Sequence, residues 1–275
     1  MISVLILTLN EEINLEGCLE SVKWSDDIVV LDSFSTDRTA EIAEKGGARF
    51  VQRAFDNYAA QRNAALSNIT YKHPWLLMVD ADERIPVELA REMSEAVKQA
   101  GVELVLFRMR RKDMFLGRWL RRSSGYPTWF GRLMRIGRVR VEREINEEYH
   151  ADGQVASLQG HLIHHPFNKG VAYWVERHNR YSSMEARALA RELLCPLVVR
   201  DCFSPDPVKR RRFLKHLAYR LPGRPLIVFS YLFILRLGFL DGKAGLRFAL
   251  LRSFYEFLID VKASELSHRE GSLRI

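Results

Sequence analysis

The chain has 275 residues, of which 47% are hydrophobic and 28% are charged, so it can bury a core and is neither disordered nor fibrous. The formal net charge of +8 is unevenly distributed: residues 108–144 and 208–262 each hold twelve Lys or Arg against three Asp or Glu, and the remainder is acidic. Two basic blocks on an acidic body argue against the general basic surface of a nucleic-acid-binding protein.

Three cysteines, Cys18, Cys195 and Cys202, are too few for a disulfide framework and lack metal-ligand spacing. The apolar run at residues 2–9 follows no basic flank and precedes two glutamates, so we expect no signal peptide. The longest uncharged apolar stretch, residues 225–235, has eleven residues. Because a membrane-spanning helix needs about 20 residues, we expect none here.

The first hundred residues alternate short apolar runs with amphipathic segments. This pattern predicts strands at 3–9, 27–31, 49–52 and 75–79, and helices after Asn14 and at 39–45, 58–66 and 86–100. Asn14 is a good cap residue, and the helix after it has one apolar face: Leu15, Cys18, Leu19 and Val22. The alternation predicts an α/β fold, with a mostly parallel sheet between helices.

The alternation of predicted strands and helices ends after Gly101. Residues 103–109 read as a strand, residues 110–135 form a basic, aromatic segment, and residues 162–165 read as a closing strand. From residue 168 the pattern is helical, with helices predicted at 170–194, 207–221, 225–240 and 242–263.

Polar side chains recur just after the predicted strands: Thr8 and Asn10, then Asp32, then Asp80 and Asp82. In an open α/β sheet, ligands bind at the edge where the parallel strands end. Asp80 and Asp82 stand two residues apart after a buried strand, a pattern typical of Mg²⁺ or Mn²⁺ held together with substrate phosphates. The alternative for Asp82 is a helix cap.

Four motifs, in this order and spacing, resemble the family 2 glycosyltransferases, which have the GT-A fold. They are residues 6–12 (ILTLNEE), 31–39 (LDSFSTDRT), 61–63 (QRN) and 79–83 (VDADE). Residues 177–183 (RHNRYSS) and 237–245 (LGFLDGKAG) resemble the lipopolysaccharide-core β-glucosyltransferase subgroup.

The resemblance implies a Rossmann-like GT-A catalytic domain at residues 1–167, with a nucleotide-sugar half at about 1–100 and an acceptor half at about 101–167. From its own helical pattern and its mixture of cations with large apolar residues, the region 168–275 is predicted to be a helical, membrane-associating extension. The implied reaction is inverting transfer of a hexose, glucose first, from a UDP-sugar to a lipid-linked or lipopolysaccharide-type saccharide, assisted by Mg²⁺ or Mn²⁺. The implied location is cytoplasmic, peripheral on the inner face of the plasma membrane.

The resemblance also implies roles for single residues. Five would border the nucleotide-sugar: Thr8, Asn10, Asp32, Arg62 and Asp80. Asp82 would ligate the metal. For Arg62, which the strand-end argument does not reach, the alternative is a solvated helix arginine.

An inverting transferase needs a carboxylate that accepts the proton of the acceptor hydroxyl. Relatives have a His-Glu pair in the matching stretch, where this chain has Asn146 and Glu147. Glu147 is therefore the predicted base, with Glu144 and Glu148 as alternatives. Two further residues could supply an imidazole to the metal or be ordinary strand-end histidines: His164 and His165.

The basic blocks suggest partners. Trp129 and Arg132 are predicted acceptor contacts, because aromatic rings stack on sugars and arginines bind phosphates; the alternative is a solvated loop. Residues 208–262 mix cations with large apolar residues, which favours an anionic membrane surface. Packing on the core or on a second protomer, giving a homo-oligomer, is the alternative.

Two other functions stay open from the sequence. A nucleotidyltransferase that makes an NDP-sugar would want a Gly-rich phosphate loop after the first strand, which residues 9–13 lack. A non-catalytic protein that binds nucleic acid or membrane is suggested only by the basic pI, and we expect no nucleic-acid partner.

Overall fold

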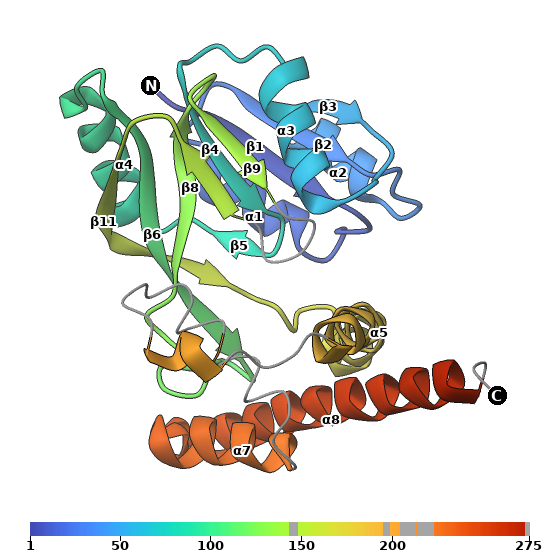
Figure 1. Cartoon of the computed structure of the whole chain (residues 1–275). Helices are drawn as coiled ribbons and strands as arrows, with labels where there is room; N and C mark the ends of the chain where they lie inside the picture. Colours follow the sequence, from blue (N-terminus) through green and yellow to red (C-terminus); the bar gives the residue numbers. More distant parts are fainter. Residues whose placement is uncertain (143–147, 195–198, 204–212, 214–222, 273–275) are drawn as a thin grey trace. The chain divides into compact units, whose positions relative to one another are not determined.

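The computed structural model describes residues 1–142, 148–194, 199–203, 213 and 223–272, and the chain divides into two compact units (Figure 1). The first unit comprises Met1–Met114 and Tyr126–Asn168, and the second comprises Phe115–Gly125 and Lys169–Ile275. Cys195 and, apart from Phe213, the predicted helix at 207–221 lie outside the described residues. The division into a catalytic domain at 1–167 and a membrane-associating region at 168–275 stays a prediction.

The first unit is built on a sheet whose strands follow the order β3-β2-β1-β4-β8-β6-β11-β5. These strands are β1 Ser3–Thr8, β2 Ile28–Asp32, β3 Arg49–Gln52, β4 Trp75–Asp80, β5 Glu83–Arg84, β6 Leu104–Phe115, β8 Trp129–Arg135 and β11 Gln154–His164. The helices are α1 Leu15–Val22, α2 Thr39–Lys45, α3 Tyr58–Asn68 and α4 Val87–Gln99. The predicted alternation over the first hundred residues is confirmed.

The pairing of the strands brings the predicted polar residues to one edge. β1 pairs in parallel with β2 and β4, and Thr8 lies opposite Asp32 while Leu7 lies opposite Asp80. β8 runs antiparallel to both β4 and β6, so the sheet is mixed. A separate hairpin is formed by β9 (Val139–Glu142) and β10 (Glu148–Ala151). The sequence pattern did not predict β8, β9 or β10.

Apolar side chains pack on both faces of this sheet, and Figure 1 shows helices along it. Successive residues of a strand point to opposite faces. Trp75 and Leu77 of β4 accordingly pack with α1, α2 and α4, while Leu76 and Met78 pack with α3 and β9. Burial on both faces explains why β1 and β4 read as continuous apolar runs in the sequence.

Helix α1 confirms one prediction and corrects another. Its predicted apolar face is buried. Asn14 does occupy the N-cap position, but its side chain makes no cap hydrogen bond within the described part of the chain. The Nδ2 of Asn14 donates instead to Glu11 Oε2 at 2.8 Å, and its Oδ1 accepts from Asn168 Nδ2 at 2.9 Å.

The second unit is helical. It contains α5 Gly170–Leu194, the 3₁₀ helix η1 Val199–Phe203, α7 Arg224–Ser230, the π-helical η2 Tyr231–Leu235, the 3₁₀ helix η3 Gly238–Asp241 and α8 Gly242–Ser272. It also contains β7 (Arg118–Trp119). The predicted helix at 225–240 is thus confirmed as far as Leu235 and wrong beyond it, because Leu237 at φ 58° turns the chain into the left-handed region.

Candidate membrane spans follow from length and composition. Across the described residues, no single helix is long and apolar enough to cross a membrane. One bent pair, Arg224–Leu235 with Gly238–His268, passes that test together, with a bend of 72° at the break.

The two motifs that carry the subgroup resemblance make packing contacts inside the second unit. In residues 177–183, the carbonyl and side-chain oxygens of Asn179 accept hydrogen bonds from Lys262 Nζ at 2.6 Å each. The hydroxyl oxygens of Ser182 and Ser183 accept from the same Nζ at 2.8 Å. From residues 237–245, Asp241 accepts from the Ser123 amide and hydroxyl at 2.8 Å. Both motifs therefore hold elements of this unit together.

Candidate active site

The ends of β1 and β2 are joined by side chains. Thr8 Oγ1 donates to Asp32 Oδ1 at 2.9 Å, and both residues are buried. Asp32 Oδ2 accepts from the Ser35 amide at 2.8 Å and from Gln52 Nε2 at 3.3 Å. The Asp32 carboxylate therefore fixes the loop that follows β2, and its own surface is fully enclosed.

The loop after β1 is built on Asn10, which adopts a left-handed backbone with φ 54°. Asparagine tolerates this conformation better than most residues, because its short polar side chain bonds locally. Asn10 Oδ1 accepts from the Thr36 amide at 2.8 Å, and the Asn10 amide donates to Ser35 Oγ at 2.8 Å. The loops after β1 and β2 therefore form one unit at the strand edge.

The end of β4 carries a cluster of opposite charges. Asp80 accepts from Arg62 Nη2 at 2.9 Å on one oxygen and from Arg132 Nη2 at 2.7 Å on the other. The same Arg132 nitrogen donates to Glu83 Oε1 at 2.7 Å, and Glu83 Oε2 accepts from the Asp80 amide at 3.1 Å. Arg62, Arg132 and Glu83 are buried, so the solvated-helix alternative for Arg62 is wrong.

This cluster sets the charge of Asp80. Burial by itself would raise the pKa of the Asp80 carboxyl, but the adjacent Arg132 and Arg62 guanidiniums outweigh it and hold that pKa well below its usual range. About a third of the side chain, 34%, stays exposed. Asp80 is therefore an ionised carboxylate, held rigidly and still open to a ligand.

Asp82 meets His164 at the end of β11. His164 Nε2 lies 3.3 Å from Asp82 Oδ2, and His164 Nδ1 lies 2.6 Å from Asp113 Oδ1 on β6. Burial alone would lower the pKa of His164, but the Asp82 carboxylate and the hydrogen bond to Asp113 raise it to about 9 against the opposing charge of Arg111. His164 is therefore a charged imidazolium between two carboxylates at neutral pH.

The described residues contain no ready-made cluster of three or more His, Cys, Asp or Glu side chains that could hold a metal ion. Asp82 and His164 nevertheless offer one carboxylate oxygen and one imidazole nitrogen side by side. Metal-ligating histidines usually give their other ring nitrogen to a carboxylate, as His164 does to Asp113. The pair fits a site that is completed by oxygens from a bound ligand.

Comparison with known proteins identifies the fold. The family model for glycosyl transferase family 2 matches residues 3–152, which is more than half of the chain. The chain belongs to glycosyl transferase family 2. The mixed sheet between helices is its GT-A fold, and the predicted fold class is confirmed.

Among the relatives of this glycosyltransferase is the lipopolysaccharide core biosynthesis glycosyltransferase LpsC of Rhizobium meliloti (strain 1021). The two are 28% identical over 228 residues, which cover 80% of this chain and 83% of LpsC. The uncharacterized glycosyltransferase RP128 of Rickettsia prowazekii (strain Madrid E) is 24% identical over 97% of this chain and 87% of its own.

A solved structure of glucosyl-3-phosphoglycerate synthase from Mycobacterium tuberculosis, in complex with Mn²⁺ and UDP-glucose, also matches. The identity is 24% and the TM-score is 0.35, over 41% of this chain and 44% of that chain. The match thus covers less than half of either chain.

The two predicted acceptor contacts of the glycosyltransferase lie in different surroundings on β8. The Trp129 ring is 40% exposed and has the Arg110 guanidinium 5.3 Å from its centroid. Arg132 is 3% exposed and binds Asp80 and Glu83. Trp129 is thus available to an acceptor sugar, whereas Arg132 belongs to the Asp80 cluster; both roles stay predictions.

The predicted base, Glu147, and its neighbours Glu144 and Asn146 lie outside the described residues. The alternative base Glu148 begins β10, which pairs with β9. In sequence, the predicted base therefore lies between these two strands. Helix α3 is joined to β9 by Asn63: its Nδ2 donates to the Val141 carbonyl at 2.7 Å, and its Oδ1 accepts from the Val141 amide at 2.9 Å. His165, the other predicted histidine, donates its amide to the Asp82 carbonyl at 2.8 Å.

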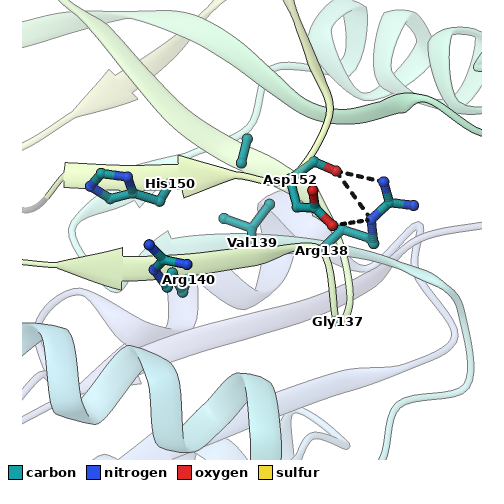
Figure 2. Close-up of a pocket in the computed structure, with 7 residues that line it drawn as sticks. Gly137, Arg138, Val139, Arg140, His150 and Asp152 are labelled. Atoms are coloured by element: carbon teal, nitrogen blue, oxygen red, sulfur yellow. Dashed lines mark hydrogen bonds and ion pairs between the residues drawn. The ribbon is translucent and has the colours of Figure 1, made fainter.

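A hollow at the base of this hairpin is a separate feature. Figure 2 shows that Arg138 and Asp152 meet at one end of it, with Arg138 Nε 3.2 Å from Asp152 Oδ2. Its described lining, Gly137–Arg140 and His150–Asp152, includes none of the residues predicted to bind donor, metal or acceptor. The strand-end chemistry therefore lies elsewhere.

Three charged residues of the site were missed by sequence reasoning: Glu83, Arg111 and Asp113. Arg111 Nε lies 3.0 Å from Asp113 Oδ1, and its Nη1 lies 3.8 Å from Glu83 Oε1. The Arg111 guanidinium also lies 4.2 Å from the centre of the Phe130 ring. Of these three, only Glu83 could have been predicted from the sequence, because it directly follows the Asp-Ala-Asp motif.

Proposed function

We propose that this protein is a metal-assisted, inverting hexosyltransferase that moves a sugar, glucose first, from a UDP-sugar to a lipid-linked or lipopolysaccharide-type saccharide. The family supports glycosyl transfer, and LpsC, named for lipopolysaccharide core biosynthesis, supports the acceptor class. The observation that carries the donor side is the placement of Asp82 beside His164, at the strand edge that also holds Asp80.

Asp82 and His164 are the residues that would hold the metal. His164 ligates only as a neutral imidazole, so binding must release its proton. A bound divalent cation would neutralise the charge that builds on the leaving diphosphate. Asp113 keeps its hydrogen bond to His164 Nδ1 and so fixes the ring with Nε2 toward Asp82.

The loops after β1 and β2 would bind the nucleoside. Asp32 and Asn10 fix the Ser33–Thr36 turn, and the Thr8 side chain is tied to Asp32. Because these bonds are made within the protein, the turn is organised before the donor arrives, which lowers the ordering cost of binding. Asp80, 34% exposed, is the carboxylate of this edge that can still accept a donor hydroxyl.

In the transfer step, the acceptor hydroxyl oxygen forms a bond to the anomeric carbon of the donor. The bond from that carbon to the diphosphate oxygen breaks, and UDP leaves with the electron pair. The hydroxyl proton passes to a carboxylate, for which Glu147 is the proposed base, with Glu144 and Glu148 as the alternatives. Attack from the face opposite the leaving group inverts the anomeric centre.

Thermal unfolding with Mn²⁺ and a panel of UDP-sugars tests the donor site. Ligand at 100 times its Kd stabilises by about 2.7 kcal/mol, and we expect the preferred donor to raise Tm by about 5 to 10 °C. Asp82→Asn and His164→Gln should lose the Mn²⁺-dependent part of that shift. Asp26 and His73, another Asp–His pair at 2.6 Å in the same unit, supply the matched controls Asp26→Asn and His73→Gln.

Equal shifts with and without Mn²⁺, or unchanged shifts in Asp82→Asn, would show that the metal assignment is wrong. The base has its own test: Glu147→Gln should keep the donor-induced shift and lose transfer by at least about 100-fold. A Glu147→Gln enzyme with near-normal transfer would move the base to Glu144 or Glu148, which the same substitution would then identify.

A further inference from the structure

The segment formed by α7 and η2 is apolar around its whole circumference and is not buried. Of its twelve residues, nine are large aliphatic or aromatic residues. All twelve are described by the structure, and none of them is buried. Leu226 is 71% exposed and Leu235 is 74% exposed. A helix that is hydrophobic all round belongs in a protein core or in lipid.

Helix α8 carries a second exposed apolar face. Five of its large apolar residues are exposed and recur at intervals of three or four: Leu246, Leu250, Phe254, Phe257 and Val261. This spacing places them on one side of the helix. The opposite side is buried, and there Tyr255 packs edge-on against His178 of α5, with ring centres 5.1 Å apart.

Hydrogen bonds and ion pairs fix α7 against α8. Arg224 Nη2 lies 2.5 Å from the buried Glu256, its Nη1 lies 3.5 Å from Asp260, and Ser253 Oγ donates to the Pro225 carbonyl at 2.7 Å. At the other end, a Cβ on Gly245 would lie 2.1 Å from the Gly238 carbonyl oxygen, so only glycine allows this approach. The apolar residues thus belong to one fixed surface.

The charges around this surface are complementary to an anionic partner. Lys243 and Arg247 are exposed beside the α8 stripe, and Arg236 closes the apolar run of η2. Three acidic residues nearby have partners within the unit: Asp241 accepts three hydrogen bonds, from the Arg122 amide and from Ser123, and Glu256 and Asp260 face Arg224. The surface therefore combines exposed apolar side chains with a positive border.

We propose that α7, η2, η3 and the outward stripe of α8 form a membrane-docking surface that enters one leaflet of an anionic bilayer. The twelve residues of α7 and η2 extend at most about 18 Å, which is short of the hydrocarbon core of about 30 Å. The chain then turns by 72°. A short apolar element bordered by cations can therefore reach the boundary of head groups and acyl chains without crossing the core.

Lipid fits this surface better than a second copy of the chain. The exposed residues of α7 and η2 lie on one side of the segment: Leu226, Ile227, Tyr231, Ile234 and Leu235. A second copy would set its own positive border against that of the first, whereas an anionic bilayer complements the border. This proposal stands apart from the donor chemistry, because every residue that carries it belongs to the second unit.

Flotation of the full-length protein with vesicles tests the proposal. We expect binding to phosphatidylcholine vesicles that contain phosphatidylglycerol, and at least a tenfold loss in partition coefficient for Ile234→Glu/Leu235→Glu and for Leu250→Glu/Phe254→Glu. The matched control, Val87→Glu/Val102→Glu, changes two exposed apolar residues of the first unit, 61% and 73% exposed, and should float like the wild type.

Lys243→Gln/Arg247→Gln should weaken binding to the anionic vesicles and leave binding to pure phosphatidylcholine unchanged. Variants that float like the wild type would overturn the proposal. So would a wild type that fails to float but sediments as a dimer dissociated by Ile234→Glu/Leu235→Glu, because the surface would then bind a second copy.

Folding and donor binding are measured on the same samples. The Ile234→Glu/Leu235→Glu variant should keep its helical circular dichroism and its Mn²⁺-dependent shift with the donor. Loss of flotation with both retained supports membrane docking. Intact flotation in a protein that shows no donor shift would overturn the proposed donor chemistry alone.

Discussion

The substitution Arg132→Met tests how the strand-end cluster is held together. Arg132 is 3% exposed, and its Nη2 bridges Asp80 and Glu83 at 2.7 Å each. Methionine keeps most of the apolar stem and removes the charge. Glu83 is fully buried and would retain only the more distant charge of Arg111 at 3.8 Å among the ion pairs described for it.

The expected cost follows from these contacts. Removing one partner of a buried ion pair typically costs about 3–5 kcal/mol. Asp80 keeps Arg62 at 2.9 Å, so we expect the lower end of that range. A loss of about 3 kcal/mol corresponds to about 150-fold faster exchange of the amides that open only on global unfolding. Amides of β1 and β4 report this for the first unit by itself.

Two comparisons make the prediction refutable. Arg138→Met removes an arginine of the same unit whose partner Asp152 is 87% exposed, and should cost at most about 1 kcal/mol. Adding Glu83→Gln to Arg132→Met should recover part of the loss, because the buried charge leaves with its partner. The structural role of the bridge would be refuted by amide exchange in Arg132→Met that is less than about fivefold faster than in the wild type. Additive effects of Arg132→Met and Glu83→Gln on stability would refute it as well.

Further predictions concern the second unit. Burial lowers the pKa of His178, which stacks on Trp174 at 3.6 Å, to about 4 from 6.5, so the stability it supports is complete above pH 6.5 and falls as the pH drops to 4. The full shift corresponds to about 3 kcal/mol at pH 4, and solvent screening of this half-buried ring reduces the expected loss to about 2 kcal/mol. Amide exchange in α5 should show this fall, and His178→Gln should flatten it. Lys262→Met removes the ammonium that joins α8 to Asn179 and should cost about 2 kcal/mol, seen in α5 amides and absent from β1. Asp241→Ala leaves three donors without their acceptor and should lower Tm, while Asp241→Asn restores part of it.

The first hundred residues could be predicted because local pattern and tertiary role agree there. Strands buried on both faces are apolar throughout, and the helices between them carry one apolar face, so both periods are visible in the sequence. The parallel pairing then follows from the short crossovers. This is why Asp32 and Asp80 could be placed at one edge from the sequence alone, as the register of β1 with β2 and β4 confirms.

β8 was missed because one of its two arginines, Arg132, is buried. In the sequence WFGRLMR, a pattern argument assigns each arginine to solvent. Arg132 is buried because Asp80 and Glu83, about fifty positions earlier in the chain, supply the compensating charge. A register shift between Phe107 and Arg108 in the pairing of β6 with β8 also breaks the alternation. Neither feature has a local signal.

The pairing of His164 with Asp113 was equally hidden, because only the parallel pairing of β11 with β6 sets them opposite each other. Strand alternation then places Asp113 with Arg111 on one face of β6, and Arg110 with Lys112 on the other. From the sequence alone, His164 and the adjacent His165 were equal candidates for a metal-binding imidazole. Their partners distinguish them: His164 lies between two carboxylates, whereas His165 contributes its backbone.

Two arginines of the first basic block pair with carboxylates of the strand edge. Arg111 and Arg132 of that block, with Arg62 and the charged His164, face four carboxylates of the strand edge: Asp80, Asp82, Glu83 and Asp113. Within this cluster the four cations balance the four carboxylates, so the cluster itself holds no excess positive charge for a diphosphate. A divalent cation that replaces the His164 proton would supply that charge, which is the physical reason why we expect donor binding to depend on metal.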